Sequence, residues 1–353
     1  NNIEPKTANL FLAESAVEAL GQVGTPETEA LLIDTFASLK DYWQYVGWYS
    51  DHPALYACHA SPVHARIIEA LDLMGSDCAA DIVPQLIRSV PTDPDRALFP
   101  GNDDYETMVG RLVCRSGRGS EVVDSCLRIL GDATVKPNAE TSADLFATHA
   151  AWAGHPDREN RAAQILSLVC RGRENEARVR AAFERYRDQS EEPVHRELGN
   201  PDWTPVRHWV LFYLARTLGQ IADSSSVEAL VSVLGDDLNE ARHGRPDPSQ
   251  PEIHMLHLEY TPCWRAAAAW ALGQIADRRA VPALLGAVRN LENAPDVRHA
   301  AAAALLRLRD LSSLPELREL AATYPEVSTR RALQAACQQL EEDLTEADKD
   351  STQ

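Results

Sequence analysis

The 353-residue sequence lacks the features that mark several common classes of protein. No apolar run approaches the roughly 18 residues that a membrane-spanning helix needs, and no segment has the pattern of a secretory signal peptide. Aromatic residues make up only 6% of the chain, and its apolar residues are mostly Ala, Leu and Val. This composition favours close-packed helices over β-sandwiches.

Positive charge is scarce as well. The chain has 34 Lys and Arg residues against 53 Asp and Glu residues, which gives a formal charge of −19. Proteins that bind nucleic acid normally present a basic face, because neutralisation of phosphates supplies most of their affinity. The charge therefore argues against nucleic acid as a partner and against binding to anionic membrane surfaces.

Cys-x-x-Cys pairs are absent, although the chain has seven cysteines. Cys114, Cys126, Cys170 and Cys337 stand in apolar helical stretches, where a free thiol behaves as a small buried hydrophobe. Unpaired thiols favour a reducing compartment, so we expect a cytoplasmic location. The chain does not begin with Met, and a processed or truncated N-terminus therefore stays open as an alternative.

The sequence does contain an internal repeat. Three segments place Leu-Gly-Gln near the end of an Ala-rich stretch, at Gly21, Gly219 and Gly273, and a leucine follows each glycine by eleven residues. Gly75 has a leucine at the same distance. The last two units repeat at an offset of 33 residues, with Arg265 matching Arg298, Leu272 matching Leu305, Pro282 matching Pro315 and Leu284 matching Leu317.

Each repeat has the pattern of two amphipathic helices. We expect a tight turn near the glycine and a capping role for Asp223 and Asp277. Pro282 and Pro315 fit the first turn of the second helix, where a missing N–H is tolerated. One such pair cannot bury its own apolar face, so neighbouring pairs must stack. Further helices are expected at 105–115, 120–130, 142–153, 158–171 and 174–187.

The segments from Arg265 to Leu285 and from Arg298 to Leu317 resemble HEAT repeats, and in particular the HEAT-like repeats of phycobilisome lyases. The resemblance implies an all-α fold, a right-handed α-α superhelix of about six to seven helix pairs that usually binds a protein. We expect this solenoid to cover residues 1–340 and a disordered acidic tail to cover 341–353. Two ordinary helical domains are the alternative fold.

Two units carry long insertions. The glycines of these units lie 54 residues apart instead of 33, which places 21 extra residues at about 40–62 and again at 236–262. Inserts of this kind emerge on one edge of a solenoid, often its binding side. The first insert is rich in Trp and Tyr, which dominate interface hot spots but also cover the edges of cores, so both interpretations stay open.

Metal and catalytic motifs have little support. His254 and His257 would share one helical face, but metal sites need three or four converging ligands. His-Glu-x-x-His and Gly-x-Ser-x-Gly are absent, as are the paired His-Glu dipeptides of HEAT-fold di-iron hydroxylases. We therefore expect no catalytic residue and no cofactor, with His254 and His257 as weak metal candidates.

These observations favour a non-catalytic scaffold or adaptor that binds a partner protein, or another domain of its own polypeptide, through its concave face and its inserts. The alternative is a protein similar to phycobilisome lyases, which handle a tetrapyrrole on a partner protein. The residues expected to anchor the partner are Trp43, Trp48, Tyr49, His52, His254, His257 and Trp264.

Overall fold

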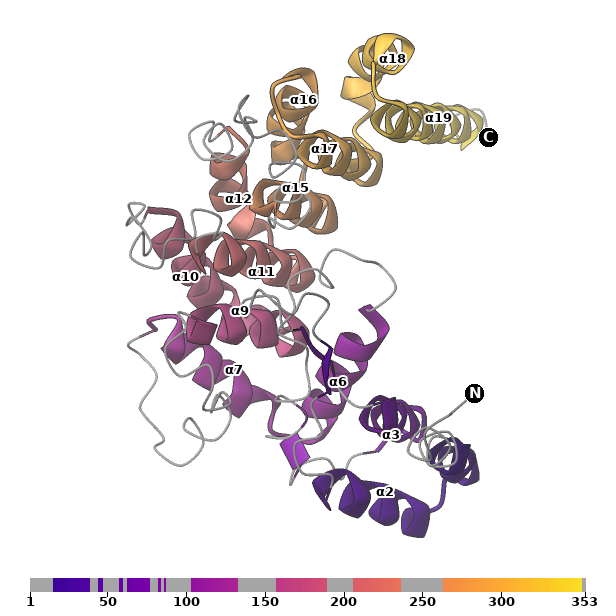
Figure 1. Cartoon of the computed structure of the whole chain (residues 1–353). Helices are drawn as coiled ribbons and strands as arrows, with labels where there is room; N and C mark the ends of the chain where they lie inside the picture. Colours follow the sequence, from indigo (N-terminus) through magenta and orange to yellow (C-terminus); the bar gives the residue numbers. More distant parts are fainter. Residues whose placement is uncertain are drawn as a thin grey trace. The chain divides into compact units, whose positions relative to one another are not determined.

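In the residues that the structure, a computed structural model, describes, the regular elements are helices apart from one short β-ladder (Figure 1). Its helices fall into two compact units, residues 1–169 and residues 170–353. The expectation of one continuous solenoid over residues 1–340 stays a prediction. The residues described are 15–38, 44–46, 57–59, 62–76, 82–83, 86, 103–132, 157–188, 206–235 and 263–350.

Among its described residues, the first unit has a helical segment at 15–23 and five longer helices. Helix α6 packs against α3 and α9, and α7 packs against α9. The helices expected at 105–115, 120–130 and 158–171 are confirmed within a few residues, whereas the one expected at 142–153 lies outside the described residues. The helices are α2 (Pro26–Ser38), α3 (Pro62–Leu73), α6 (Asp103–Arg115), α7 (Gly119–Ile129) and α9 (Asp157–Val169).

The β-ladder lies within the first predicted insert. Strand β1 (Gln44–Val46) pairs antiparallel with β2 (Ala57–His59), and Tyr45 stands opposite Cys58. Aromatic and β-branched residues such as Tyr45 and Val46 favour this extended conformation. The all-α prediction therefore holds for the repeats but not for these six residues.

One carboxylate ties α3 to α6 in the first unit. Asp72 accepts hydrogen bonds from Arg111 Nε at 3.1 Å and from Arg115 at 2.7 Å, and its side chain is 9% exposed. Burial alone would raise the pKa of Asp72, but the hydrogen bonds and charges of the two arginines outweigh it, and the pKa lies below its usual value of 3.8. The link therefore stabilises the folded state only while the carboxyl is ionised.

Asp72→Asn should lower the free energy of unfolding by about 1–3 kcal/mol at pH 7, because two cationic donors lose a charged acceptor. The wild-type advantage should be complete above pH 3.8 and should vanish as the pH falls through the lower pKa of the folded protein. Chemical denaturation of both proteins between pH 2.5 and pH 7 measures the difference. Glu69→Gln, in the exposed pair with Arg66, is the control and should change stability by less than about 1 kcal/mol.

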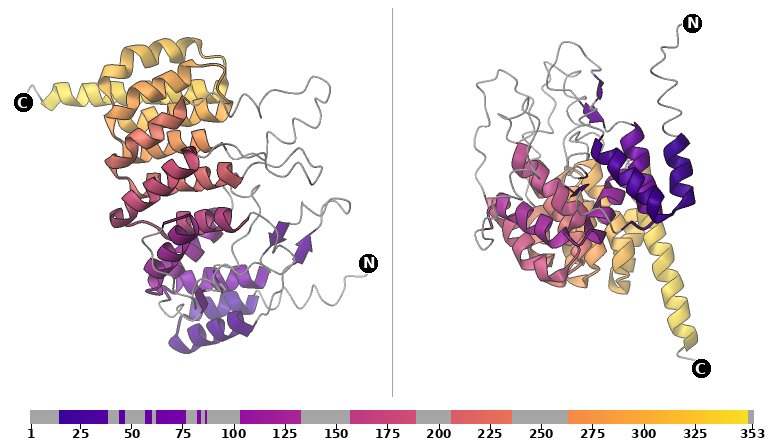
Figure 2. Two further views of the ribbon diagram at one scale, coloured as in Figure 1. Left: turned by 90° about the vertical axis from the view of Figure 1, so that its left-hand side faces the viewer. Right: turned by 90° about the horizontal axis from the view of Figure 1, so that it is seen from below.

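The second unit arranges its helices in two rows (Figures 1 and 2). The helices of the first row pack on one another in chain order, α11 on α15, α15 on α17 and α17 on α19. The first row is α11 (Val206–Ile221), α15 (Trp264–Ile275), α17 (Pro295–Leu308) and α19 (Val327–Asp350). The second row is α10 (Glu176–Asp188), α12 (Val227–Leu234), α16 (Val281–Arg289) and α18 (Leu314–Thr323).

The glycine of the Leu-Gly-Gln motif sets the spacing of the first row. A Cβ at Gly219 would lie 2.7 Å from Ala271 Cα, and a Cβ at Gly273 would lie 2.8 Å from Ala304 Cα. Real Cβ atoms do not approach backbone this closely, so only glycine allows these helices to meet. The motif is therefore a helix contact, and the turn that was expected near the glycine follows it closely along the chain.

The turn comes three residues later. Ala222 and Ala276 have positive φ values of 53° and 56°, in the left-handed conformation that commonly ends helices. Gly24 holds this position in the first repeat, with φ of +63°. Gly75, with φ of +68°, is also a turn residue. It therefore corresponds to Gly24 and not to Gly21, and the alignment of Gly75 with Gly21 is wrong by three positions.

Short 3-10 turns lead from the first row to the second row. Asp223 accepts a hydrogen bond from the backbone N–H of Ser225 before η6 (Ser224–Ser226), and Asp277 caps η7 (Arg278–Ala280) in the same way through Arg279. Prolines stand in the first turns of α16 and α18. The capping aspartates and the first-turn prolines are therefore confirmed.

Two buried arginines link successive repeats. Arg265 is 1% exposed and donates to the carbonyl oxygen of Leu234 and to Asn293 Oδ1, the latter at 2.8 Å. Arg298, one repeat later, donates to the carbonyl of Leu291 at 2.7 Å and forms an ion pair with Glu326. Each arginine reaches a residue 28 positions ahead, just before the next first-row helix. The repeated arginine therefore joins one helix pair to the next.

Two sequence predictions need correction. Cys126, Cys170 and Cys337 are buried as expected, but Cys114 is exposed, because Leu112 and Val113 turn the apolar face of α6 away from it. The acidic segment predicted to be disordered from residue 341 continues α19 as far as Asp350. Thr345 donates to the carbonyl of Glu341, and side-chain bonds from the glutamines at 338 and 339 reach residues four positions ahead.

Gly273→Ala should lower the free energy of unfolding of the protein by about 1–3 kcal/mol, because the methyl group must push α15 and α17 apart. Gly286→Ala is the matched control. A Cβ there meets nothing within 4 Å, and the substitution should stabilise α16 by up to about 1 kcal/mol. Urea denaturation compares the two variants, and equal effects would contradict the close approach at Gly273.

Candidate protein-interaction surface

Most of the predicted anchor residues lie outside the described part of the chain. Their roles, and those of His254 and His257 as metal candidates, stay predictions. Trp264 is the exception, since it begins α15 and is only 3% exposed. It packs inside the second unit and is not available to a partner in this arrangement. The anchors outside the described residues are Trp43, Trp48, Tyr49, His52, His254 and His257.

Metal and membrane sites find no support within the described ranges. No group of three or more His, Cys, Asp or Glu side chains converges there in a way that could hold a metal ion. Among the helices described, none combines the length and the apolar character needed to cross a bilayer. The exposed helix surfaces of the second unit are the remaining candidates for a functional site.

The exposed side of α10, α12, α16 and α18 forms what we call the second-row surface. On α16, the exposed residues Pro282, Gly286 and Arg289 are three or four positions apart and share one helical face. Arg279, just before the helix, is also exposed and continues this face. At each junction between neighbouring helices of this surface, and at the junction of α18 with α19, an arginine side chain reaches across. We call these residues, Arg187, Arg279, Arg289 and Arg318, the seam arginines.

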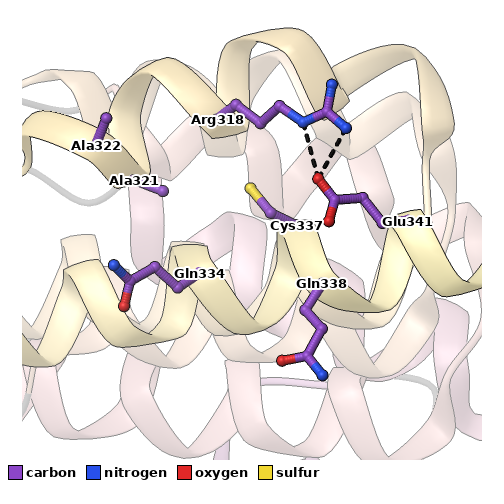
Figure 3. Close-up of a pocket in the computed structure, with 7 residues that line it drawn as sticks. All are labelled: Arg318, Ala321, Ala322, Gln334, Cys337, Gln338 and Glu341. Carbon is purple, nitrogen blue, oxygen red and sulfur yellow. Dashed lines mark hydrogen bonds and ion pairs between the residues drawn. The ribbon is translucent and has the colours of Figure 1, made fainter.

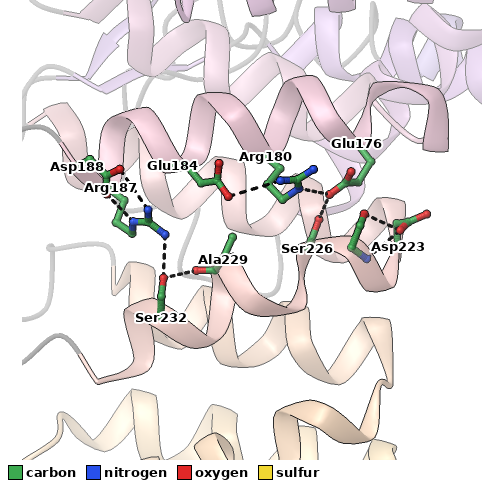
Figure 4. Close-up of polar contacts among 10 residues, drawn as sticks. Glu176, Arg180, Glu184, Arg187, Asp188, Asp223, Ser226, Ala229 and Ser232 are labelled. Carbon is green, nitrogen blue, oxygen red and sulfur yellow. Dashed lines mark hydrogen bonds and ion pairs between the residues drawn. The ribbon is translucent and has the colours of Figure 1, made fainter.

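The first junction joins α10 to α12 around a buried carboxylate (Figure 4). Glu176, 7% exposed at its side chain, accepts hydrogen bonds from the hydroxyl of Ser226 and from Arg180 Nε, the latter at 2.9 Å. Arg180 also lies 3.6 Å from Glu184. The hydrogen bond to Glu176 raises the pKa of Arg180, which stays charged.

Arg187 makes the second link of this junction (Figure 4). Its Nε donates to Asp188 at 2.7 Å, and its Nη1 donates to the hydroxyl of Ser232 on α12 at 3.0 Å. Ser232 in turn donates to the carbonyl of Ala229 at 2.7 Å. The hydrogen bond to Asp188 raises the pKa of Arg187. Because each hydroxyl and guanidinium has a defined partner, the junction is held in one geometry.

Arg279 links α16 back to α12. Its Nη2 donates to the carbonyl of Ser224 at 2.7 Å and to Asp277 at 2.8 Å, and its Nη1 lies 3.7 Å from Glu228. The hydrogen bond from Arg279 holds the pKa of Asp277 below its usual value. The Arg279 side chain nevertheless remains 53% exposed. Its guanidinium group is therefore both held in place and accessible to solvent.

The last two seam arginines link α16 to α18 and α18 to α19. Arg289 forms an ion pair with Glu316, and Arg318 Nε donates to Glu341 at 2.9 Å. Both arginine side chains are more than half exposed. Ion pairs this exposed add little stability, so their main effect is to orient the guanidinium groups.

An open groove of about 240 Å³ lies between α18 and α19 (Figure 3). Arg318 and Glu341 line this groove. In the preceding repeat, 33 residues earlier, their positions are held by Leu285 and Leu308, which are both buried. An ion pair of exposed side chains thus stands where the preceding repeat has two buried leucines. The lining residues are Arg318, Ala321, Ala322, Gln334, Cys337, Gln338 and Glu341.

The groove is poorly suited to chemistry. Burial first and then the charge of Glu341 raise the pKa of the Cys337 thiol, which is only 8% exposed. A thiol with a raised pKa is a weak nucleophile.

Comparison with known families agrees with this architecture. Residues 261–338 match the family of HEAT repeats, and these residues cover α15 to α18 and the first half of α19. This part of the chain is therefore built of HEAT repeats, as the sequence resemblance implied. A comparison with curated proteins found no match.

Sequence reasoning missed the seam arginines. It found that Arg265 and Arg298 repeat at 33 residues but assigned them no role, and it directed attention to the aromatic inserts. The links from Arg279 and Arg187 span 55 and 45 residues of sequence. Only the stacking of helices brings these partners together. The sequence signal that could have located them was the position of arginines at the ends of the second-row helices.

Proposed function

We propose that this protein is a non-catalytic interaction scaffold that binds a partner protein, or another domain of the same polypeptide, across its second-row surface. The match to HEAT repeats supports this function, because such repeats generally act as protein-interaction scaffolds. We further propose that the helix pairs continue as a right-handed superhelix whose concave side is the second-row surface.

Gly286 is the observation that carries the proposal. It lies in the middle of α16, where glycine costs about 1 kcal/mol relative to alanine. Gly219 and Gly273 are required by neighbouring backbone, whereas a side chain at Gly286 would meet nothing of the described fold within 4 Å. A helical glycine without an internal reason is best explained by an external backbone or side chain that approaches α16 at this point.

The seam arginines support the same surface. Arg279, in η7, and Arg289, at the end of α16, flank Gly286 on the same exposed side and lie ten residues apart. Each is held by a carboxylate while it remains more than half exposed. Ordering a guanidinium before a partner arrives reduces the entropy lost on binding. Arginine is also enriched among the residues that dominate interfaces.

The two inserts complete the proposed binding region. We propose that they contribute aromatic and histidine contacts from the edge of the solenoid, as their composition predicts. Tetrapyrrole handling is not part of the proposal, because the HEAT match rests on structural residues and no described side chain favours that chemistry. The insert anchors remain Trp43, Trp48, Tyr49, His52, His254 and His257.

Gly286→Leu should reduce capture of the partner about tenfold or more without reducing stability, because the new side chain projects from α16 into the space that the partner would occupy. The measurement is quantitative affinity capture from native extract with the tagged full chain, followed by mass spectrometry. The thermal midpoint of the variant should equal or exceed that of the wild type.

His299→Leu on the first row is the matched control, since it adds a similar apolar side chain at an exposed position of α17. It should leave capture unchanged. Deletion of residues 40–62 tests the insert separately. If Gly286→Leu captures the same proteins in the same amounts as the wild type, the second-row surface is not the binding site.

A further inference from the structure

Helix α19 has an exposed stripe with the spacing of a coiled-coil seam. Its members alternate at intervals of three and four residues, which places them on one face. The opposite face carries Leu333, Ala336 and Leu340, which are buried in contact with the rest of the unit. The exposed stripe consists of Ser328, Arg331, Ala335, Gln338, Glu342 and Thr345.

Charge is distributed unevenly along this stripe. Arg331 stands in the N-terminal half of α19, and Glu342 stands in the C-terminal half beside Glu341 and Asp343. Arg331 and Glu342 are eleven residues apart, or roughly 16 Å along the helix, so they cannot pair within one chain. Within a single copy of the chain, Arg331 and Glu342 therefore do not neutralise each other.

A second copy of α19, laid antiparallel on the first, supplies that compensation. The stripe is self-complementary about a point between residues 336 and 337. Arg331 then faces the Glu342 of the other copy, Ala335 faces its Gln338, and Ser328 faces its Thr345. A two-fold axis generates each contact twice. The acidic half of each helix also lies beside the positive N-terminal end of the other.

We propose that two copies of this chain associate through α19, antiparallel, with two symmetric Arg331–Glu342 ion pairs at the interface. Figure 2 shows α19 extending past the other helices of its unit, and the side chains of the stripe are exposed. The surface between α18 and α19 is polar as well, as the exposed Arg318–Glu341 pair illustrates, so it suits a charged contact. This association does not depend on the proposed scaffold function.

The interface is electrostatic in character. Ala335 is the one apolar member of the stripe, so little apolar area is buried and the affinity depends on charge. Association should therefore be strongest at low ionic strength. It should weaken as added salt shortens the Debye length from about 10 Å at 0.1 M to about 3 Å at 1 M.

Sedimentation equilibrium of the full chain at low salt, from micromolar to near-millimolar concentration, tests the proposal. The wild type should form a dimer, and Arg331→Glu or Glu342→Arg alone should weaken it about tenfold or more, because like charges then face each other twice. The double variant R331E/E342R should restore the dimer to within about threefold of the wild type. Because the two residues cannot meet within one chain, recovery reports contact between copies.

Arg278→Glu is the matched control, since Arg278 is exposed at η7 and lies off α19; it should leave the dimer constant unchanged. Far-ultraviolet circular dichroism confirms that each variant is folded. A wild type that stays monomeric at the highest concentration would overturn the proposal. So would a dimer that neither single variant weakens, or a double variant that fails to recover.

Discussion

The second unit depends on the close approach of α11, α15 and α17 at two glycines. Each contact leaves no room for even one methyl group, because the neighbouring backbone lies under 3 Å from the position of a Cβ. The Ala-rich faces of α15 and α17 extend the same tight contact along both helices, and their leucines fill the interior. With the first row spaced in this way, the short turns that follow place the second row at a fixed distance, and the seam arginines can reach across each junction.

Polar side chains then fix the register of the stack. Arg265 and Arg298 occupy the same position in successive repeats and satisfy carbonyl groups at the ends of helices and loops, which would otherwise lose hydrogen bonds to water on burial. A buried arginine tolerates little displacement of its partners, so it favours one alignment of neighbouring pairs. The exposed seam arginines contribute orientation more than stability. A rigid interior thus presents an ordered outer surface, which is the property that a binding scaffold requires.

Much of the local architecture could be predicted from sequence, whereas the site could not. Repetition of Leu-Gly-Gln, of capping aspartates and of first-turn prolines located the helix pairs of the second unit, because these signals are local. The close helix contacts at Gly219 and Gly273 were not predicted, since a glycine near the end of a helix more often marks a cap or turn. The pairing of Arg279 with Ser224 and Glu228 depends on stacking between distant repeats. No local pattern encodes such a contact.

The central claim is that successive repeats are locked by the buried arginine, and a double-mutant cycle on Arg298 and Glu326 tests it directly. Unfolding free energies are measured for the wild type, Arg298→Met, Glu326→Gln and the double variant. The account predicts a coupling energy of about 1–3 kcal/mol, since the pair joins α17 to the start of α19 with little exposure at the arginine. Additive effects, with a coupling energy near zero, would contradict it.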